Sequence, residues 1–100
     1  GIDLANEFGT PIVATAPGTV EKVQSSSYGY GNYVVIRHKL GFSTLYAHMR
    51  SYVVTPGEQV KKNQIIGYMG STGYSTGVHL HYEVRIANKP VDPWSYLNVD

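Results

Sequence analysis

Two histidines separated by one residue, His79 and His81, are the side chains in this sequence best suited to bind a metal. They lie in the run 78–86, whose β-branched and aromatic residues predict a strand. Side chains of a strand alternate between its two faces, so both imidazoles should project from one side, about 7 Å apart along the chain. A His-x-His pattern alone is weak, because alternating histidines also occur on solvated strand faces. It predicts a strand that presents two imidazoles to one site.

Zinc is the metal whose chemistry fits these donors. A catalytic zinc typically takes three nitrogen or oxygen ligands and leaves a fourth position to water, whose pKa falls to about 7. Two histidines and one carboxylate would satisfy that requirement. The sequence of 100 residues contains no cysteine, which excludes disulfides and a thiolate zinc site. A metal in this chain must therefore be held by imidazole and carboxylate.

A family resemblance extends this pattern over essentially the whole chain. Residues 67–84 read GYMGSTGYSTGVHLHYEV, which closely resembles the metal-site signature of the lysostaphin and LytM-like zinc endopeptidases. The resemblance continues in four further segments, which are GIDLA at 1–5, GTPIVA at 9–14, LYAHM at 45–49 and VKKNQIIG at 60–67.

The resemblance implies a division of roles among the histidines. In that family a His, an Asp four residues later and the second His of His-x-His bind zinc. The first His of that pair and a separate Tyr-Ala-His act on the substrate. Carried over by motif, Asp3 and His81 are metal ligands, and His48 and His79 are the catalytic pair. Attack on an amide needs a base and donors to the oxyanion, and neutral imidazole can serve either purpose near pH 7.

The same resemblance implies a substrate and a location. It predicts a zinc-dependent endopeptidase that hydrolyses peptide cross-links of bacterial peptidoglycan, in stems or bridges, in the periplasm, the cell envelope or the medium. The first metal-ligating His of the family would lie two residues before Gly1. We therefore expect residues 1–100 to form one zinc endopeptidase domain that is incomplete at its N-terminus.

Three further residues are assigned roles in or near the site. Glu83 shares the strand face of the histidine pair and is interpreted as a solvated charge or as a partner that orients an imidazole. His38 has no partner at motif spacing and is interpreted as a structural hydrogen-bonding residue. Tyr74, just before the pair, is the one candidate for substrate binding. The glycines around it precede a strand and not a helix, which predicts a close-packed loop at the cleft rim rather than a phosphate site.

The elements that must position these residues are strands. Short β-branched and aromatic runs alternate with Gly, Pro, Asn and Ser, and no window shows helical periodicity, so the sequence predicts a nearly all-β fold. We expect a small antiparallel domain of two packed sheets with an open substrate groove and one short helical turn at 92–96. The expected strands are residues 12–15, 19–24, 32–38, 42–48, 64–69 and 78–86.

Local signals fix some connections and one buried face. The segment Lys39-Leu40-Gly41 predicts a bulged antiparallel hairpin, and Pro56-Gly57 predicts a turn. On the last expected strand the positions between the histidines and beyond them are apolar and should meet the core. These positions are Leu80, Tyr82, Val84 and Ile86.

Charge and hydropathy exclude two classes of partner. Eight Lys and Arg stand against seven Asp and Glu, and the only adjacent basic pair is Lys61-Lys62, so nucleic acid is not an expected partner. The apolar runs, such as residues 33–36, are far shorter than the roughly 18 residues of a membrane-spanning helix. We expect no membrane contact by this domain, and its oligomeric state stays open.

Two other functions compete with the enzyme. The first is a non-catalytic LytM-like scaffold or activator of another cell-wall hydrolase, which the joint presence of Asp3, His48, His79 and His81 disfavours. The second is a carrier domain of the biotinyl or lipoyl kind, because residues 60–67 resemble the turn and strand of such barrels. That reading lacks a Met-Lys attachment context and leaves the histidines unexplained.

Overall fold

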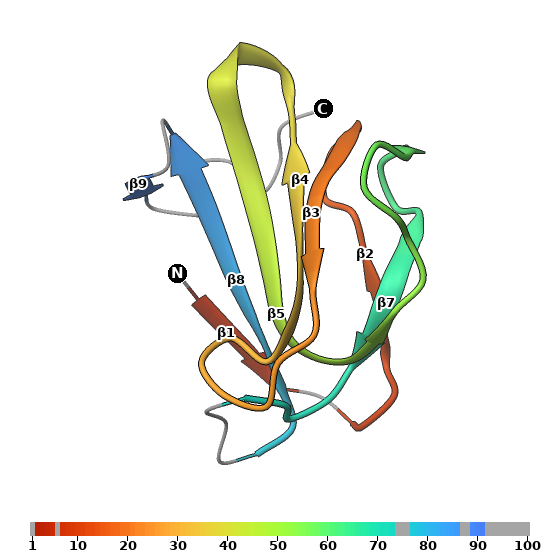
Figure 1. The fold of residues 1–100 in the computed structure, drawn as a ribbon, viewed down its shortest axis with the longest axis vertical. Coiled ribbons are helices and arrows are strands. Elements are labelled where there is room, and N and C mark those ends of the chain that lie inside the picture. The colour runs from red at the N-terminus through yellow and green to blue at the C-terminus, as the bar shows by residue number, and fades with distance from the viewer. Residues whose placement is uncertain (1, 6, 74–76, 87–88, 92–100) are drawn as a thin grey trace.

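The computed structural model describes residues 2–5, 7–73, 77–86 and 89–91 (Figure 1), and describes residues 2–5, 79 and 89–91 by their backbone alone. Over these ranges the chain forms nine strands and one 3-10 turn. The strands are β1 (Ile2–Ala5), β2 (Pro11–Val13), β3 (Gly18–Gln24), β4 (Asn32–Arg37), β5 (Phe42–Tyr52), β6 (Gln59–Val60), β7 (Ile65–Met69), β8 (His79–Ile86) and β9 (Lys89–Val91). The turn η1 (Lys39–Gly41) lies between β4 and β5.

The strands form a single curled antiparallel sheet. Its main path is β1-β8-β5-β4-β3-β6, while β9 pairs with β8, and β7 pairs with both β2 and β5. In the view of Figure 1, β2 and β7 lie to the right of β3, and β8 and β9 lie to the left of β5. The all-β antiparallel prediction is confirmed in this part of the chain.

The prediction of two packed sheets is wrong, because the described strands form one sheet, and β5 is the reason. Residues 42–47 of β5 pair with β8, and residues 49–52 of the same strand pair with β7. Between these stretches His48 has a φ of 60°, and the register of β5 against β4 shifts there, because Val34 pairs with Tyr46 but Asn32 pairs with Met49. A bulge of this kind bends a strand and increases its twist. One long bent strand therefore joins the strands of the main path and the β2–β7 pair into one sheet.

The core lies between the strands of the main path and the β2–β7 pair. Its fully buried side chains come from β3, β4, β5, β8 and the β2–β7 layer, and the largest are Val20, Val34, Ile36, Tyr46, Met49, Ile66, Tyr82 and Val84. The predicted apolar face of β8 is confirmed at Leu80, Tyr82 and Val84. It is wrong at Ile86, which is 38% exposed because it is the last residue of the strand.

The two predicted turns are confirmed. The β4–β5 hairpin closes through η1 with Leu40 and Gly41 both at positive φ, 63° and 76°. At the second turn Gly57 has a φ of 89°, and the amide of Glu58 donates to the carbonyl of Thr55 at 3.1 Å. Glycine supplies the left-handed conformation that other residues adopt only at a cost.

Some expectations about elements are not met or not reached. The strands β1, β6 and β9 were not predicted from the sequence, and each has four residues or fewer. The helical turn predicted at 92–96 lies outside the described residues. Among the residues that are described, no helix is long and apolar enough to cross a membrane.

Candidate active site

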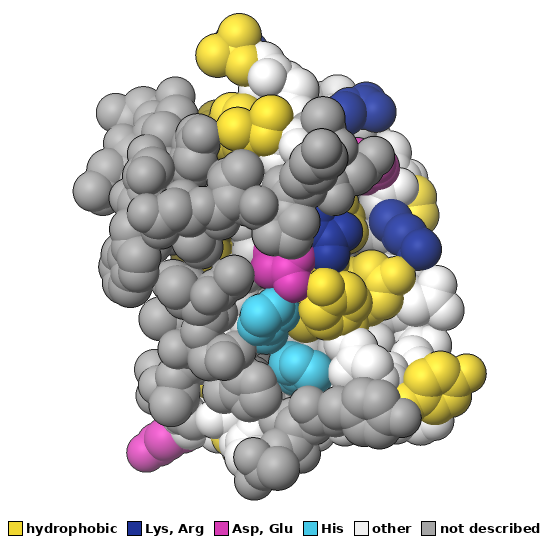
Figure 2. Space-filling view, turned by 90° about the vertical axis from the view of Figure 1, so that its left-hand side faces the viewer, with side chains coloured by type: hydrophobic (Ala, Val, Ile, Leu, Met, Phe, Trp, Pro, Cys, Tyr) yellow, Lys and Arg dark blue, Asp and Glu magenta, His cyan; other side chains and the backbone are white. Residues whose placement is uncertain are grey.

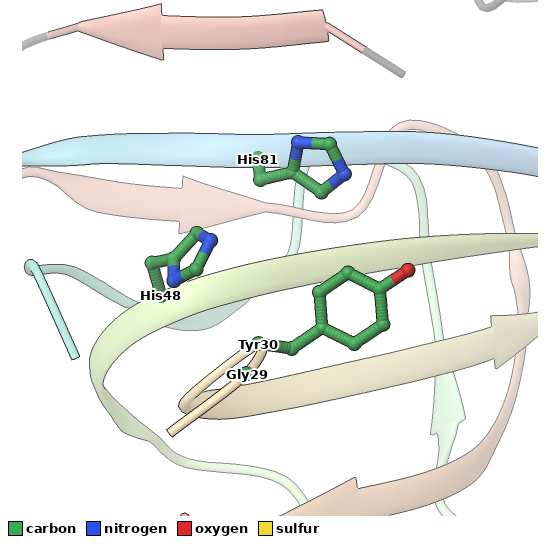
Figure 3. A pocket seen from close by; sticks show the side chains of 4 residues that line it. All are labelled: Gly29, Tyr30, His48 and His81. Atoms are coloured by element: carbon green, nitrogen blue, oxygen red, sulfur yellow. The ribbon is translucent and has the colours of Figure 1, made fainter. Parts of the chain in front are cut away.

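Two of the predicted site residues, His48 and His81, line one open cavity of about 320 Å³ together with Gly29 and Tyr30 (Figure 3). His81 comes from β8, His48 from β5, and Tyr30 from the loop before β4. The pairing of Ala47 with His81 holds the two strands side by side, and the two imidazole centroids are 6.1 Å apart. On the face drawn in Figure 2, histidine side chains lie at the surface beside acidic and basic groups.

Glu83 fixes the ring of His81. Nε2 of His81 lies 2.7 Å from the Oε2 atom of Glu83. A carboxylate at this position accepts only, so Nε2 carries the proton, and in the neutral imidazole the lone pair is on Nδ1. The ring of Tyr30 stacks on the same imidazole with centroids 5.8 Å apart and an interplanar angle of 19°. His81 is therefore held in one orientation and one tautomer.

Glu83 is itself held by two more donors. The hydroxyl of Tyr30 donates to Oε2 at 2.7 Å, and Nε of Arg85 donates to Oε1 at 2.8 Å. Arg85 also donates from Nη2 to the Tyr30 hydroxyl at 3.0 Å and lies over the Tyr30 ring. The side chains thus form a closed network around one carboxylate, which is 5% exposed.

The network sets the charge of Glu83. Burial alone would raise the pKa of the Glu83 carboxyl, but hydrogen bonds from His81, Tyr30 and Arg85 outweigh burial and lower that pKa below its ordinary value. Burial and the Glu83 hydrogen bond raise the pKa of the Tyr30 hydroxyl, which therefore stays protonated and donates. The reading of Glu83 as a solvated charge is wrong, and its reading as a partner that orients an imidazole is confirmed.

His48 is fixed by backbone groups from two loops. Its Nδ1 atom lies 2.6 Å from the carbonyl oxygen of Thr72, and its amide donates to the carbonyl of Tyr30 at 2.8 Å. The residue is 7% exposed and has a φ of 60°, a conformation that side-chain-bearing residues adopt only at a cost. A strained conformation of this kind persists where the surroundings over-determine it.

The remaining predicted site residues are placed by backbone or not placed. The register sets Asp3 of β1 directly opposite His81 of β8, and Ala5 opposite His79. Tyr74 lies outside the described residues. Among the residues whose side chains the structure describes, no three His, Cys, Asp or Glu side chains come together to hold a metal ion. The side chains of Asp3 and His79 are not among those described.

A second cavity of about 190 Å³ adjoins the first, because Tyr30 lines both. It lies over the outer face of β3, β4, β5 and β8. Its lining combines aromatic, apolar and charged side chains, which are Glu21, Lys22, Tyr30, Tyr33, Val35, Ser43, Leu45 and Arg85. The surface beside the histidines can thus contact an extended ligand beyond the first cavity.

His38 lies outside these cavities and makes structural hydrogen bonds, as predicted. Its Nδ1 atom is 2.7 Å from the carbonyl of Pro17, and Nε2 is 2.7 Å from the hydroxyl of Thr44. Burial lowers the pKa of His38, although the hydrogen bond to Pro17 acts in the opposite direction.

Sequence reasoning missed three residues that touch the two histidines or their partners, namely Tyr30, Thr72 and Arg85. Arg85 had a usable signal, since it follows Glu83 by two positions and so shares its strand face. Tyr30 and Thr72 lie in loops that are distant along the chain from the histidine rings that they contact, and nothing in their spacing indicated a contact.

Comparison with known proteins decides the family. The model of peptidase family M23 matches residues 1–93. The chain belongs to peptidase family M23. Among solved structures, this M23 chain is similar to the catalytic domain of the antimicrobial peptidase lysostaphin from Staphylococcus simulans, with a TM-score of 0.89 and 37% identity over 97% of this chain and 77% of that one. The lysostaphin-like resemblance of the sequence is confirmed.

Curated relatives of the M23 chain differ in function. It is 48% identical over 95 residues to the DD-carboxypeptidase/endopeptidase Mpg of Neisseria meningitidis serogroup B, a match that covers 95% of this chain and 22% of that protein. It is 42% identical over 97 residues to the murein hydrolase activator NlpD of Salmonella dublin, covering 97% and 26%. The chain thus spans about a quarter of the length of either relative.

Proposed function

We propose that this M23 chain is the catalytic domain of a zinc-dependent endopeptidase that hydrolyses peptide cross-links of bacterial peptidoglycan. One observation carries the proposal: His48 and His81, on different strands, line one open cavity with their ring nitrogens held by different partners. His38, by contrast, hydrogen-bonds to Pro17 and Thr44 and lines neither this cavity nor the one beside it. The cavity that His48 and His81 line is open to a surface that an extended chain can reach.

The residues fit a zinc ion. His81 would bind it through Nδ1, because Nε2 is on the Glu83 carboxylate, and metal-ligating histidines usually donate their other N–H to such a group. Asp3 is opposite His81 in the register, and directly opposite positions share one face of the sheet. The third ligand is the histidine expected just before Gly1. When bound, zinc supplies a Lewis acid and makes hydroxide available near neutral pH.

The other two histidines act on the substrate. The proton on Nδ1 of His48 is held by the Thr72 carbonyl, so in the neutral ring Nε2 has the lone pair with which a general base accepts a proton. His79, two positions before His81 on β8, supplies the second imidazole, which donates to the oxyanion of the attacked amide. Tyr74 contacts the substrate from the glycine-rich segment before β8.

The substrate class and the location are supported by the relatives. Mpg is a DD-carboxypeptidase/endopeptidase, lysostaphin is an antimicrobial peptidase, and NlpD is a murein hydrolase activator. Peptidoglycan stems or bridges are the corresponding substrate, and the protein then works outside the cytoplasm, in the periplasm or envelope or as a secreted enzyme. The second candidate, activation of another wall hydrolase, is supported by the 42% identity to the murein hydrolase activator NlpD.

Zinc content measured beside turnover tests the assignment of roles. In the full-length protein, His81→Ala should lose both zinc and activity because a metal ligand is gone. His79→Ala and His48→Ala should keep their zinc and lose about 10²- to 10⁴-fold in turnover, the usual effect of removing a positioned acid or base. Equal zinc loss in His79→Ala and His81→Ala would show that both bind metal and would overturn the division of roles.

A further inference from the structure

Thr72 lies where three segments distant in sequence meet. Its hydroxyl donates to the carbonyl of Met49 at 2.7 Å and accepts from the amide of Asn32 at 3.0 Å. Its carbonyl oxygen is 2.6 Å from Nδ1 of His48. One residue therefore joins the loop before β8, the start of β4 and the bulge of β5 that contains His48.

The carbonyl of Thr72 determines which nitrogen of His48 has the proton. A carbonyl oxygen can only accept a hydrogen bond, so the nitrogen that faces it must be Nδ1–H. In the neutral imidazole the lone pair is then on Nε2, and the ring can accept a proton there. Without this contact both tautomers of the ring become accessible, and one of them has its lone pair on the wrong nitrogen.

The hydroxyl of Thr72 determines where that carbonyl lies. Its two hydrogen bonds go to the carbonyl of Met49, the residue after His48, and to the amide of Asn32, which pairs with Met49. The adjoining loops are also closely packed. A Cβ at Gly31 would overlap the carbonyl carbon and hydroxyl of Thr72, and a Cβ at Gly73 would overlap the backbone of Gly29 and Gly31. Both glycines also have positive φ, 66° and 73°. The loops are thus packed backbone against backbone around the Thr72 side chain.

We propose that Thr72 is a positioning residue for His48: its carbonyl fixes the Nδ1–H tautomer, and its hydroxyl fixes the carbonyl. The proposal rests on the function proposed above, in which His48 acts on the substrate. Thr72 touches neither substrate nor metal in this account. Its effect on the reaction passes through the ring of His48, and this sets it apart from a residue that merely stabilises the loop.

The tautomer of His48 can be observed directly by ¹⁵N NMR of the full-length protein labelled at histidine, with His48→Gln identifying the signal. The wild type and Thr72→Ser should show the proton on Nδ1. Thr72→Val keeps the carbonyl and the branched shape but loses the hydroxyl, so it should show a mixture of tautomers. Its kcat should fall about 10- to 100-fold, as expected for a misplaced catalytic group, with KM within about twofold. Thr72→Ser should retain wild-type turnover.

Thr10→Val is the matched control. The Thr10 hydroxyl also donates to a backbone carbonyl, that of Glu7 at 2.7 Å, but at an exposed turn that makes no described contact with His48. This variant should leave both tautomer and kcat unchanged. An unchanged tautomer in Thr72→Val, with or without loss of turnover, would overturn the proposal. If Thr72→Val does not fold, the wild-type spectrum still tests the proposal, because a proton on Nε2 of the neutral His48 ring would contradict the proposal. The NMR measurement needs no substrate, so its failure is distinct from a failure of the proposed function.

Discussion

Glu83 illustrates at the residue scale how a carboxylate can be buried and remain ionised. Hydrogen bonds from His81, Tyr30 and Arg85 offset the cost of burying its charge, and charge-assisted hydrogen bonds of this kind are the strong ones. The same bonds hold the ring of His81 and leave its lone pair on Nδ1. Glu83 therefore contributes to metal binding in the proposed function without being a ligand.

Replacing this carboxylate tests that contribution. Glu83→Gln keeps the size of the side chain but presents an amide nitrogen to donors that already have hydrogens, and it removes the negative charge beside Arg85. Zinc affinity should fall about 10- to 100-fold, the usual effect of losing such an outer partner. Competition with a chromogenic chelator measures it. Glu58→Gln, whose carboxylate bonds Thr55 and Gln64 away from the site, is the control. Unchanged affinity in Glu83→Gln would contradict the role given to Glu83.

The sequence predicted residues of the site better than it predicted their contacts. The motif named His48 and His81, and both line the cavity. Side-chain alternation put Glu83 on the face of the histidines, but it could not show that the carboxyl is buried, because Tyr30 and Arg85 bury it from another loop and from the same strand. Contacts between loops, such as that of Thr72 with His48, depend on the fold and leave no local pattern.

The bend in β5 governs the site at the scale of elements. The bend lets one strand pair with β8 before His48 and with β7 after it, so that the strands on both sides of the core belong to one sheet. His48 lies at the bend and lines the cavity. No pattern in the sequence indicates this bend, since the residue type alone does not reveal a histidine with positive φ. The short strands β1, β6 and β9 were missed because two to four residues are too few to establish alternation.

The β4–β5 hairpin makes the stability of the fold depend on pH through His38. Burial lowers the pKa of His38 in the folded protein below its ordinary value of 6.5, although the Pro17 hydrogen bond opposes this. The unfolded chain then binds a proton more readily than the folded one. The contribution of neutral His38 is thus fully present above pH 6.5 and is lost as the pH falls from 6.5 toward the lower folded-state pKa.

Urea unfolding of the wild type and of His38→Gln at pH 7.5 and 5.5 measures this contribution. The wild type should lose more of its free energy of unfolding over this interval than the variant does. Comparing the two proteins cancels the effects of other groups that titrate in both. Equal losses would show that His38 is not held neutral by burial.

At the scale of the whole molecule, the proposed site is assembled from parts that are far apart along the chain. Asp3 comes from the first strand, His48 from the middle of the longest, and His79 and His81 from β8, and the antiparallel pairing of β1, β8 and β5 brings them to one region. The all-β class could be predicted from local runs. The single curled sheet could not, because it depends on how one bent strand joins two layers.

Products released from purified peptidoglycan test the central claim most directly. Incubation with the full-length protein should release soluble fragments and expose new amino groups, with no new reducing sugar ends, because an endopeptidase cuts amide and not glycosidic bonds. Removal of zinc by a chelator should stop the release and added zinc should restore it. His81→Ala is the inactive control. New reducing ends, or no release by the zinc-loaded wild type, would contradict the account, and the second result would favour an activator of another hydrolase.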